Sequence, residues 1–249
     1  TLSNELWDLG VRDAYSLRRV VDKLRGQRRF TFAGVLHFSS QHYLMRKWLR
    51  SGGIRPEVDV DITMLPPPQV HTCLREGHID GYCVAEPWSS VGLLRGIGWC
   101  VTLTADFDPM HPEKVFMVRE SFERERHDEH VRLLAALIEA ARYCDEPRNR
   151  REIAAMLAQP NYIGVPRDVL ENALIGPFRM GMETSSRKTS HCWLRASCRA
   201  SAPSSASPAT TRSSVSERIC RRPWRTMAGS SAMRTRIMSR TGSAVCFLL

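Results

Sequence analysis

The sequence predicts an α/β fold whose sheet is mostly parallel. Between about residues 28 and 120, short apolar segments typical of strands alternate with amphipathic segments typical of helices, and from Asp128 onward only helical patterns follow. Alternation of this kind is typical of βαβ units, in which ligands bind at the carboxyl ends of the strands. The 249 residues are 43% hydrophobic, which is enough for a packed core.

The first predicted helix begins after Asp13, whose carboxylate can cap it, and runs to about Gly26. A strand over 30–36 then leads through a polar loop into a helix that ends at Gly52-Gly53. The next predicted elements are a strand over 58–65, a helix over 68–76 with Gly77 as its C-cap, a strand over 79–84, a helix over 87–95, and strands over 99–104 and 115–119.

Apolar stripes predict two further helices that pack into the core. One stripe lies within residues 131–141 and the other within residues 153–157, and a last short helix is expected over 168–174. Globular patterning fades after Gly176-Pro177.

We expect the function to lie at the junction formed by residues 79–88, because a short apolar strand there passes directly into a helix. Pro87 suits the first helical position, where its missing N–H costs nothing. Unpaired backbone N–H groups at such a corner can bind an anion.

Charge is distributed unevenly along the chain. Residues 184–249 hold 12 of the 36 Lys and Arg but only one of the 26 acids, Glu217, so this tail is strongly basic and the rest of the chain is nearly neutral. The Ser- and Arg-rich composition of the tail, without apolar periodicity, predicts disorder. One interpretation is a nucleic-acid-binding arm; we favour the other, a reading frame shifted after about Met182. We expect the folded body to bind no nucleic acid directly.

The body of the chain shows no catalytic or metal-binding constellation. It lacks the GxSxG, HExxH, P-loop and GxGxxG motifs. His37 and His42 have no acidic partner near them in sequence, so we interpret them as polar loop residues and expect neither a metal nor a cofactor. The body cysteines form no CxxC pair, and their apolar contexts predict buried free thiols. They are Cys73, Cys83, Cys100 and Cys144.

Four segments, in this order and spacing, carry a family resemblance that covers roughly residues 1–180. They are Phe38-Ser39-Ser40 through Arg46-Lys47-Trp48-Leu49 and Gly52-Gly53-Ile54; Leu65-Pro66-Pro67-Pro68-Gln69-Val70; Gly77-His78-Ile79-Asp80-Gly81-Tyr82-Cys83-Val84-Ala85-Glu86-Pro87-Trp88-Ser89; and His111-Pro112-Glu113-Lys114-Val115. Together they resemble the nitrate/nitrite/bicarbonate-binding proteins of ABC transporters. The similar cytoplasmic nitrate sensors that partner an antiterminator share these segments.

The resemblance implies a periplasmic-binding-protein fold of type II, in which two α/β lobes close on a small anion. Much of the first lobe is then expected to precede Thr1. The implied organisation is a remnant of the first lobe and a linker over 1–27, an α/β ligand-binding lobe over 28–120, a helical segment packing on the lobes over 121–182, and the basic tail, disordered or frame-shifted, over 183–249.

By position, the resemblance places the ligand-binding groups of the family on Gln41, Ala85 and Lys114, with Glu86 and His42 as neighbours in the candidate set. Gln41 stands where nitrate binders have His, and glutamine cannot become cationic, so a charge-assisted hydrogen bond is lost. Ala85 stands where Gly is usual, and its methyl group restricts the approach of a ligand to the backbone. His42 can compensate for Gln41 only if its side chain points inward.

The implied function is binding, without chemistry, of a small oxyanion by the solute-binding component of an ABC importer, with nitrate or nitrite as the first expectation. The partners would be the anion and the membrane subunits of the transporter, in the periplasm or on the outer face of the inner membrane. The alternatives are a cytoplasmic nitrate sensor that regulates a transcription antiterminator protein, and a truncated or frame-shifted fragment without function. An enzyme resembling the thiamine-precursor enzymes on the same fold would need a nucleophilic cysteine in the cleft, and Cys83 is expected inside a strand.

Overall fold

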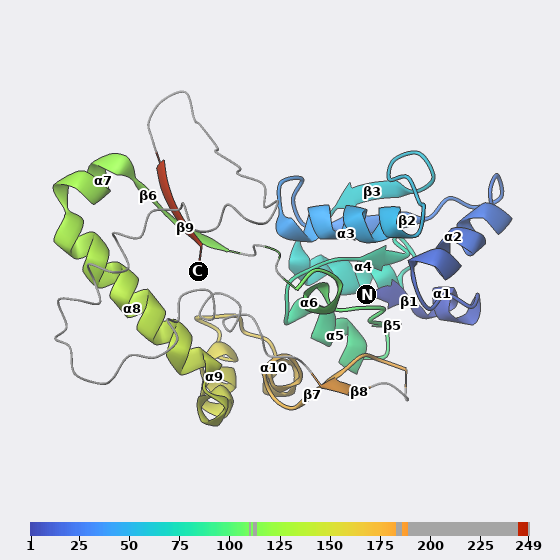
Figure 1. Ribbon diagram of the computed structural model, residues 1–249. Helices are drawn as coiled ribbons and strands as arrows, with labels where there is room; N and C mark the ends of the chain where they lie inside the picture. The colour runs from blue at the N-terminus through green and yellow to red at the C-terminus, as the bar shows by residue number, and fades with distance from the viewer. Residues whose placement is uncertain (110, 112–113, 183–185, 189–243, 249) are drawn as a thin grey trace, which may run out of the picture. The chain divides into compact units, whose positions relative to one another are not determined.

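The computed structural model describes residues 1–109, 111, 114–182, 186–188 and 244–248 (Figure 1). Most of the basic tail lies outside these residues. The predictions of disorder and of a shifted reading frame concern this tail. The chain divides into two compact units: Thr1–Glu113 with Cys144–Trp193, and Lys114–Tyr143 with Leu194–Leu249.

The first unit is built on a five-stranded sheet in the order β3-β2-β4-β1-β5. The strands are β1 (Leu2–Ser3), β2 (Thr31–Gly34), β3 (Asp61–Met64), β4 (Gly81–Tyr82) and β5 (Gly98–Trp99). β2 runs parallel to both β3 and β4, whereas β1 runs antiparallel to β4 and β5. The prediction of a parallel sheet is therefore confirmed for the three strands that follow one another through helices, and β1 is the departure from it.

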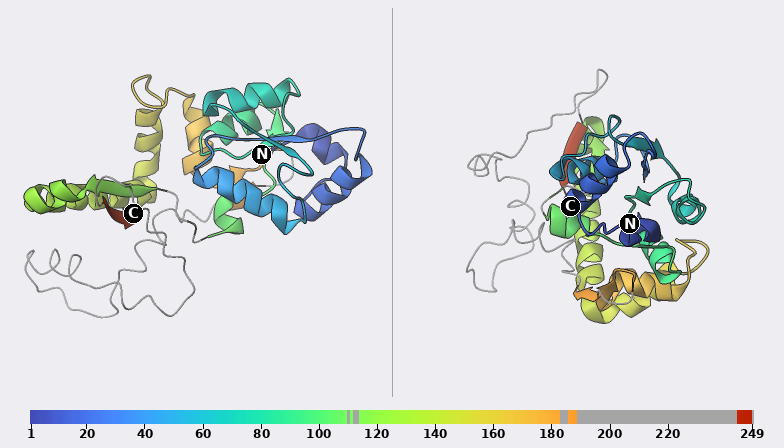
Figure 2. Two further views of the ribbon diagram at one scale, coloured as in Figure 1. Left: turned by 90° about the horizontal axis from the view of Figure 1, so that it is seen from above. Right: turned by 90° about the vertical axis from the view of Figure 1, so that its right-hand side faces the viewer.

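Helices cover this sheet, and α3 runs alongside β2 (Figure 1). The helices of the first unit are α1 (Asn4–Asp8), α2 (Ala14–Lys23), α3 (Ser40–Ser51), η1 (Pro67–Gln69), α4 (Val70–Arg75), α5 (Trp88–Leu94), α6 (Thr104–Phe107), η2 (Pro147–Asn149), α9 (Arg150–Leu157) and α10 (Arg167–Leu174). α10 packs against α5 and α9 and is followed by β7 (Pro177–Arg179), which pairs with β8 (Ser186–Lys188) (Figure 2).

Local signals explain where the long helices begin. The Asp13 carboxylate accepts a hydrogen bond from the Ser16 N–H at 2.7 Å, which confirms Asp13 as the N-cap of α2. Ser39 caps α3 by accepting from the His42 N–H at 3.2 Å, so this helix starts within the segment predicted to be a loop. His42 is therefore a helical residue, which corrects its interpretation as a loop residue.

The strand predicted over 79–84 is shorter in the structure. Only Gly81 and Tyr82, the two residues of β4, pair with β2. Glycine suits position 81 because a Cβ there would lie 2.6 Å from the Leu2 side chain. Cys83 still donates its N–H to the Ala33 carbonyl at 3.0 Å, and beyond it the chain leaves the sheet. Cys83 thus follows the strand, and the prediction that it lies inside the strand is wrong.

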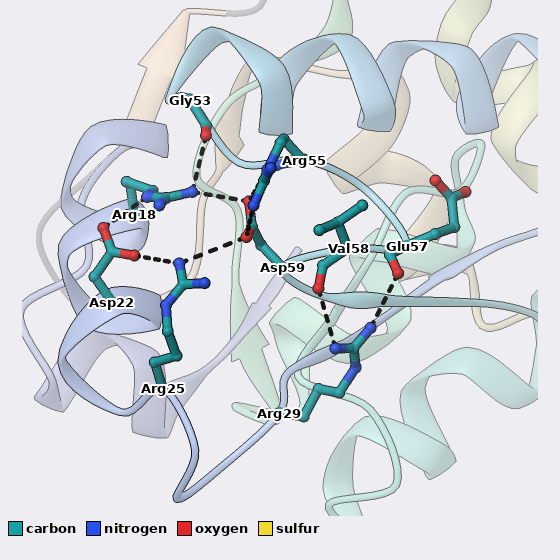
Figure 3. Close-up of polar contacts among 9 residues, drawn as sticks. All are labelled: Arg18, Asp22, Arg25, Arg29, Gly53, Arg55, Glu57, Val58 and Asp59. Atoms are coloured by element: carbon teal, nitrogen blue, oxygen red, sulfur yellow. Dashed lines mark hydrogen bonds and ion pairs between the residues drawn. The ribbon is translucent and has the colours of Figure 1, made fainter.

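A buried carboxylate fastens α2 to the turn that precedes β3 (Figure 3). The Asp59 side chain has no exposed surface and accepts from Arg18 at 2.8 Å and from the Arg55 guanidinium at 3.1 Å. Arg25 lies 3.5 Å from the same carboxylate, and Arg18 also donates to the Gly53 carbonyl at 2.9 Å. These contacts join segments that the sheet itself does not connect.

The second unit contains β6 (Val115–Arg119), α7 (Glu120–Glu125) and α8 (His127–Asp145), and β6 pairs antiparallel with β9 (Ala244–Leu248). The strand predicted over 115–119 is confirmed. The stripe predicted to pack α8 into a core is only partly covered: Leu134 is buried, Val131, Leu137 and Ile138 are half-buried, and Leu133 is 41% exposed. On α9, by contrast, Ile153 is buried as predicted.

The cysteines of the described residues are free thiols. Cys100 is buried, Cys73 and Cys83 are half-buried, and Cys144 is exposed, so burial is wrong for Cys144. None of the helices in the described ranges combines the length and apolar character needed to cross a membrane.

Candidate functional site

Four of the five candidate residues follow strands that end at one edge of the sheet. β2, β3 and β4 are parallel neighbours, so their carboxyl ends lie at the same edge. Gln41 and His42 lie in the first turn of α3, which follows β2, and Ala85 and Glu86 lie in the segment between β4 and α5. The sequence placed these residues correctly after strand ends.

The segment of residues 83–87, which we call the corner, presents backbone donors. Within the described part of the chain, no hydrogen-bond partner is found for the N–H groups of Val84, Ala85 and Glu86. All three residues are half-buried, so their amides are not deep in the core. Adjacent unpaired amides at the end of a strand can surround an anion. α5 begins at Trp88 with Pro87 as its N-cap, one position later than predicted.

The Glu86 side chain turns toward α5. Its Oε2 accepts from the Ser90 hydroxyl at 2.7 Å and from the Ser90 N–H at 3.2 Å. Burial raises the pKa of the Glu86 carboxyl, against the opposing effect of the bonds from Ser90. A carboxylate repels an anion, so this side chain is suited to hold the corner, and the backbone of Glu86 is the part suited to bind.

His42 points inward, as a compensating role requires. Its side chain is only 6% exposed, and a Cβ at Gly34, the last residue of β2, would lie 3.4 Å from its Nδ1. No described residue bonds to this Nδ1. Burial lowers the pKa of His42, and the positive charges of Arg46 and His37 lower it further. At neutral pH the imidazole is therefore uncharged and can donate from one nitrogen only.

Lys114 belongs to the second unit, where it is exposed and directly precedes β6. Its neighbours Pro112 and Glu113 in the His-Pro-Glu-Lys motif lie outside the described residues.

A cavity of about 50 Å³ lies next to the corner and includes Cys83 in its wall. The wall is formed by Thr1, Leu2, Phe32, Leu44, Met45, Trp48, Tyr82, Cys83, Val101, Thr102, Thr104 and Phe107. These lining residues include no histidine or carboxylate that could activate a thiol. Among the described residues no group of three or more His, Cys, Asp or Glu side chains could hold a metal ion.

Two residues of the site were missed by sequence reasoning. Ser90 and Asn172 reach Glu86 through a buried chain of hydrogen bonds. The spacing of Glu86 and Ser90, four residues apart at a helix start, is a local signal that could have suggested their contact. Asn172 lies 82 residues from Ser90 and has no such signal.

The open sheet covered by helices has the fold of the periplasmic binding proteins. The chain superposes with a TM-score of 0.69 on the crystal structure of the periplasmic nitrate-binding protein NrtA from Synechocystis PCC 6803. The match covers 77% of this chain and 49% of that chain, at 25% identity. The predicted fold class is thereby confirmed.

Residues 1–158 match the model of the NMT1-like family, and the chain belongs to this family. It is 36% identical over 182 residues to the nitrate import ATP-binding protein NrtC of Synechocystis sp. PCC 6803, which is 73% of this chain and 27% of that protein. It is 30% identical over 156 residues to the bicarbonate-binding protein CmpA of Synechococcus elongatus PCC 7942, which is 63% of this chain and 35% of that protein. The predicted resemblance to nitrate- and bicarbonate-binding proteins is confirmed, and the chain spans half or less of the length of each of these three relatives.

Proposed function

We propose that the chain binds a small inorganic oxyanion, with nitrate first and bicarbonate second, as the solute-binding component of an ABC importer. The observation that carries the proposal is the set of three adjacent unpartnered amides at the corner. Relatives named for nitrate and for bicarbonate support the ligand class, and their names favour neither anion decisively.

The candidate residues supply the donors that an oxyanion needs. The backbone amides at Ala85 and Glu86 and the side-chain amide of Gln41 donate neutral hydrogen bonds. The neutral His42 adds one further donor if its second nitrogen faces the ligand. Lys114 brings the positive charge, as a point charge on a flexible stem.

The proposed mechanism is closure without a chemical step. The anion gains contacts in the closed state that it lacks in the open state, so binding shifts the population toward closure. The membrane subunits of the importer would then recognise the closed form. No residue of the proposed site needs to act as a nucleophile or base.

The test is calorimetric titration of the 249-residue chain with sodium nitrate and, separately, with sodium bicarbonate. Replacing Lys114 with alanine removes a hydrogen bond from a charged donor, of about 1.5–3 kcal/mol, so we expect a loss of affinity of about 10- to 150-fold. Lys23→Ala is the matched control, because Lys23 is an exposed lysine in α2, away from the ligand edge. Unchanged affinity in Lys114→Ala would remove Lys114 from the site, and a wild-type chain that binds neither anion would reject the proposed function.

A further inference from the structure

A chain of buried hydrogen bonds begins at the corner and ends more than 80 residues away in the sequence. The Ser90 hydroxyl donates to Glu86 Oε2 at 2.7 Å, and Asn172 Nδ2 donates to the same hydroxyl at 2.9 Å. Asn172 Oδ1 in turn accepts the N–H of Arg179 in β7 at 3.1 Å. This hydrogen-bond chain therefore connects the corner with α5, α10 and β7.

Each group in this hydrogen-bond chain can act in only one way, as the donor or as the acceptor of each bond. The hydroxyl of Ser90 has a single proton, which it gives to Glu86, so it must accept from Asn172. The amide of Asn172 uses its NH₂ toward Ser90 and its oxygen toward Arg179, which fixes the orientation of the amide. The direction of every bond is thus determined by its neighbours.

The burial of these groups makes their bonds costly to lose. The Ser90 side chain has no exposed surface and Asn172 is 8% exposed. Around them, Val91 of α5 packs with Val169 and Leu170 of α10 in one apolar cluster. A polar group left without its partner in such surroundings is strongly disfavoured, so the arrangement holds as a unit.

This hydrogen-bond chain is one of several attachments of the corner. On one side it is tied to the sheet by the Cys83 N–H, and at its centre the Ala85 carbonyl accepts from Trp88 at 3.3 Å. The amides of Val84, Ala85 and Glu86 have no partner in the described structure, so they do not hold the backbone themselves. On the helix side, the Glu86 side chain bonds to Ser90, and the Pro87 carbonyl accepts from the Val91 N–H at 3.1 Å.

We propose that Ser90 and Asn172 are positioning residues for the anion: they hold Glu86 and thereby aim the amides of the corner, without touching the ligand. This inference rests on the proposed function for its ligand, but the attachment itself can be tested without one. It assigns a role in anion affinity to α10, whose residues lie outside every motif of the family resemblance.

The experiment uses Ser90→Ala and Asn172→Ala in the 249-residue chain. Hydrogen–deuterium exchange within residues 83–87 is read at the Cys83 N–H, the amide there that has a hydrogen-bond partner, and it should be about tenfold faster in both variants. Titration with sodium nitrate and sodium bicarbonate should show affinity about fivefold or more weaker. In the double variant the affinity should equal that of Ser90→Ala, because Asn172 acts through Ser90.

Ser16→Ala is a matched control for a general loss of stability. The Ser16 hydroxyl also contacts a carboxylate at 2.7 Å, that of Asp13, and its N–H also donates to that side chain. We expect this control to lower the melting temperature while leaving both the affinity and the exchange of residues 83–87 at the wild-type values. An equal effect of Ser16→Ala on these two measurements would overturn the inference.

Other outcomes separate the two proposals. If the wild-type chain binds neither anion, the proposed function fails, and exchange at residues 83–87 still decides whether Ser90 and Asn172 hold the corner. If exchange and affinity are unchanged in both variants, the positioning role is rejected while the proposed function stands. Should Ser90→Ala not fold, Asn172→Ala makes the test instead, because it removes the bond that orients the Ser90 hydroxyl toward Glu86 and changes no residue of α5.

Discussion

Replacing Asp59 with asparagine tests how much the buried ion-pair cluster of Figure 3 stabilises the fold. The Asp59 carboxylate accepts bonds from Arg18 and from both the backbone and the guanidinium of Arg55. Asparagine keeps one oxygen and turns an NH₂ group toward these donors. The substitution therefore removes bonds to a charged acceptor without changing the shape of the side chain.

The structure sets the size of the expected effect. Breaking a fully buried ion pair costs about 3–5 kcal/mol. Here the side chains of Arg18 and Arg55 are 27% and 65% exposed and regain water, so the cost is lower. We expect about 2 kcal/mol, the range of a hydrogen bond to a charged group. For a chain of this size that lowers the melting temperature by about 4–8 °C.

The assay is thermal unfolding followed by circular dichroism at several pH values. The hydrogen bond and charge of Arg55 lower the pKa of Asp59 well below its ordinary value of 3.8. A lowered carboxyl pKa stabilises the fold above the ordinary value, and this contribution is lost as the pH falls through the folded-state pKa. The difference between wild type and Asp59→Asn should therefore be constant from pH 7 to about 4 and shrink below that.

Asp61→Asn is the matched control, because Asp61 pairs with Arg29 at 2.7 Å and both side chains are about half exposed. Such exposed pairs contribute about 0–1 kcal/mol, so the control should melt within about 3 °C of wild type. A melting temperature of Asp59→Asn within about 1 °C of wild type at pH 7 would refute the reasoning.

Two further predictions concern the helix that carries Gln41. In Gly52→Ala the new Cβ would lie 2.2 Å from the Ala14 carbonyl oxygen, a backbone atom that cannot move alone, so unfolding measured by urea titration should require about 2–3 kcal/mol less free energy. In Gln41→Ala the lost side chain is half-buried at the start of α3, and we expect nitrate affinity to fall about threefold to tenfold, as for one neutral hydrogen bond, in calorimetric titration. A wild-type urea unfolding curve for Gly52→Ala, or wild-type affinity for Gln41→Ala, would contradict the respective expectation.

Local sequence signals predicted the helices well and the strand lengths poorly. The cap at Asp13 and the periodicity after it define α2 without help from the rest of the chain. A strand, in contrast, extends only as far as its neighbours pair with it, and the apolar run over 79–84 is longer than its ladder with β2. β1 has two residues and depends on pairing with β4 and β5, so no local pattern could reveal it.

The residues of the candidate site also differ in whether the sequence could place them. The residues that follow strand ends, such as Gln41 and Ala85, could be placed because parallel strands bring their carboxyl ends to one edge. The inward direction of His42 depends on the lack of a side chain at Gly34, where a Cβ would lie 3.4 Å from the His42 Nδ1, and a local sequence pattern does not specify this proximity. The contact of Asn172 with Ser90 could not be predicted from the sequence, because it exists only after α10 has packed on α5.

The charges of the candidate residues explain why positioning matters in this chain. Gln41 is neutral, His42 is kept neutral by burial, and the Glu86 carboxyl, if ionised, would oppose an anion. Among the five candidates only Lys114 is cationic, so most donors of the proposed site are neutral. Neutral donors bind an anion well only when they are aimed before it arrives, because each reorientation costs free energy that a weak bond cannot offset. We therefore expect affinity to depend on the rigidity of the corner, which Ser90 and Asn172 control through Glu86.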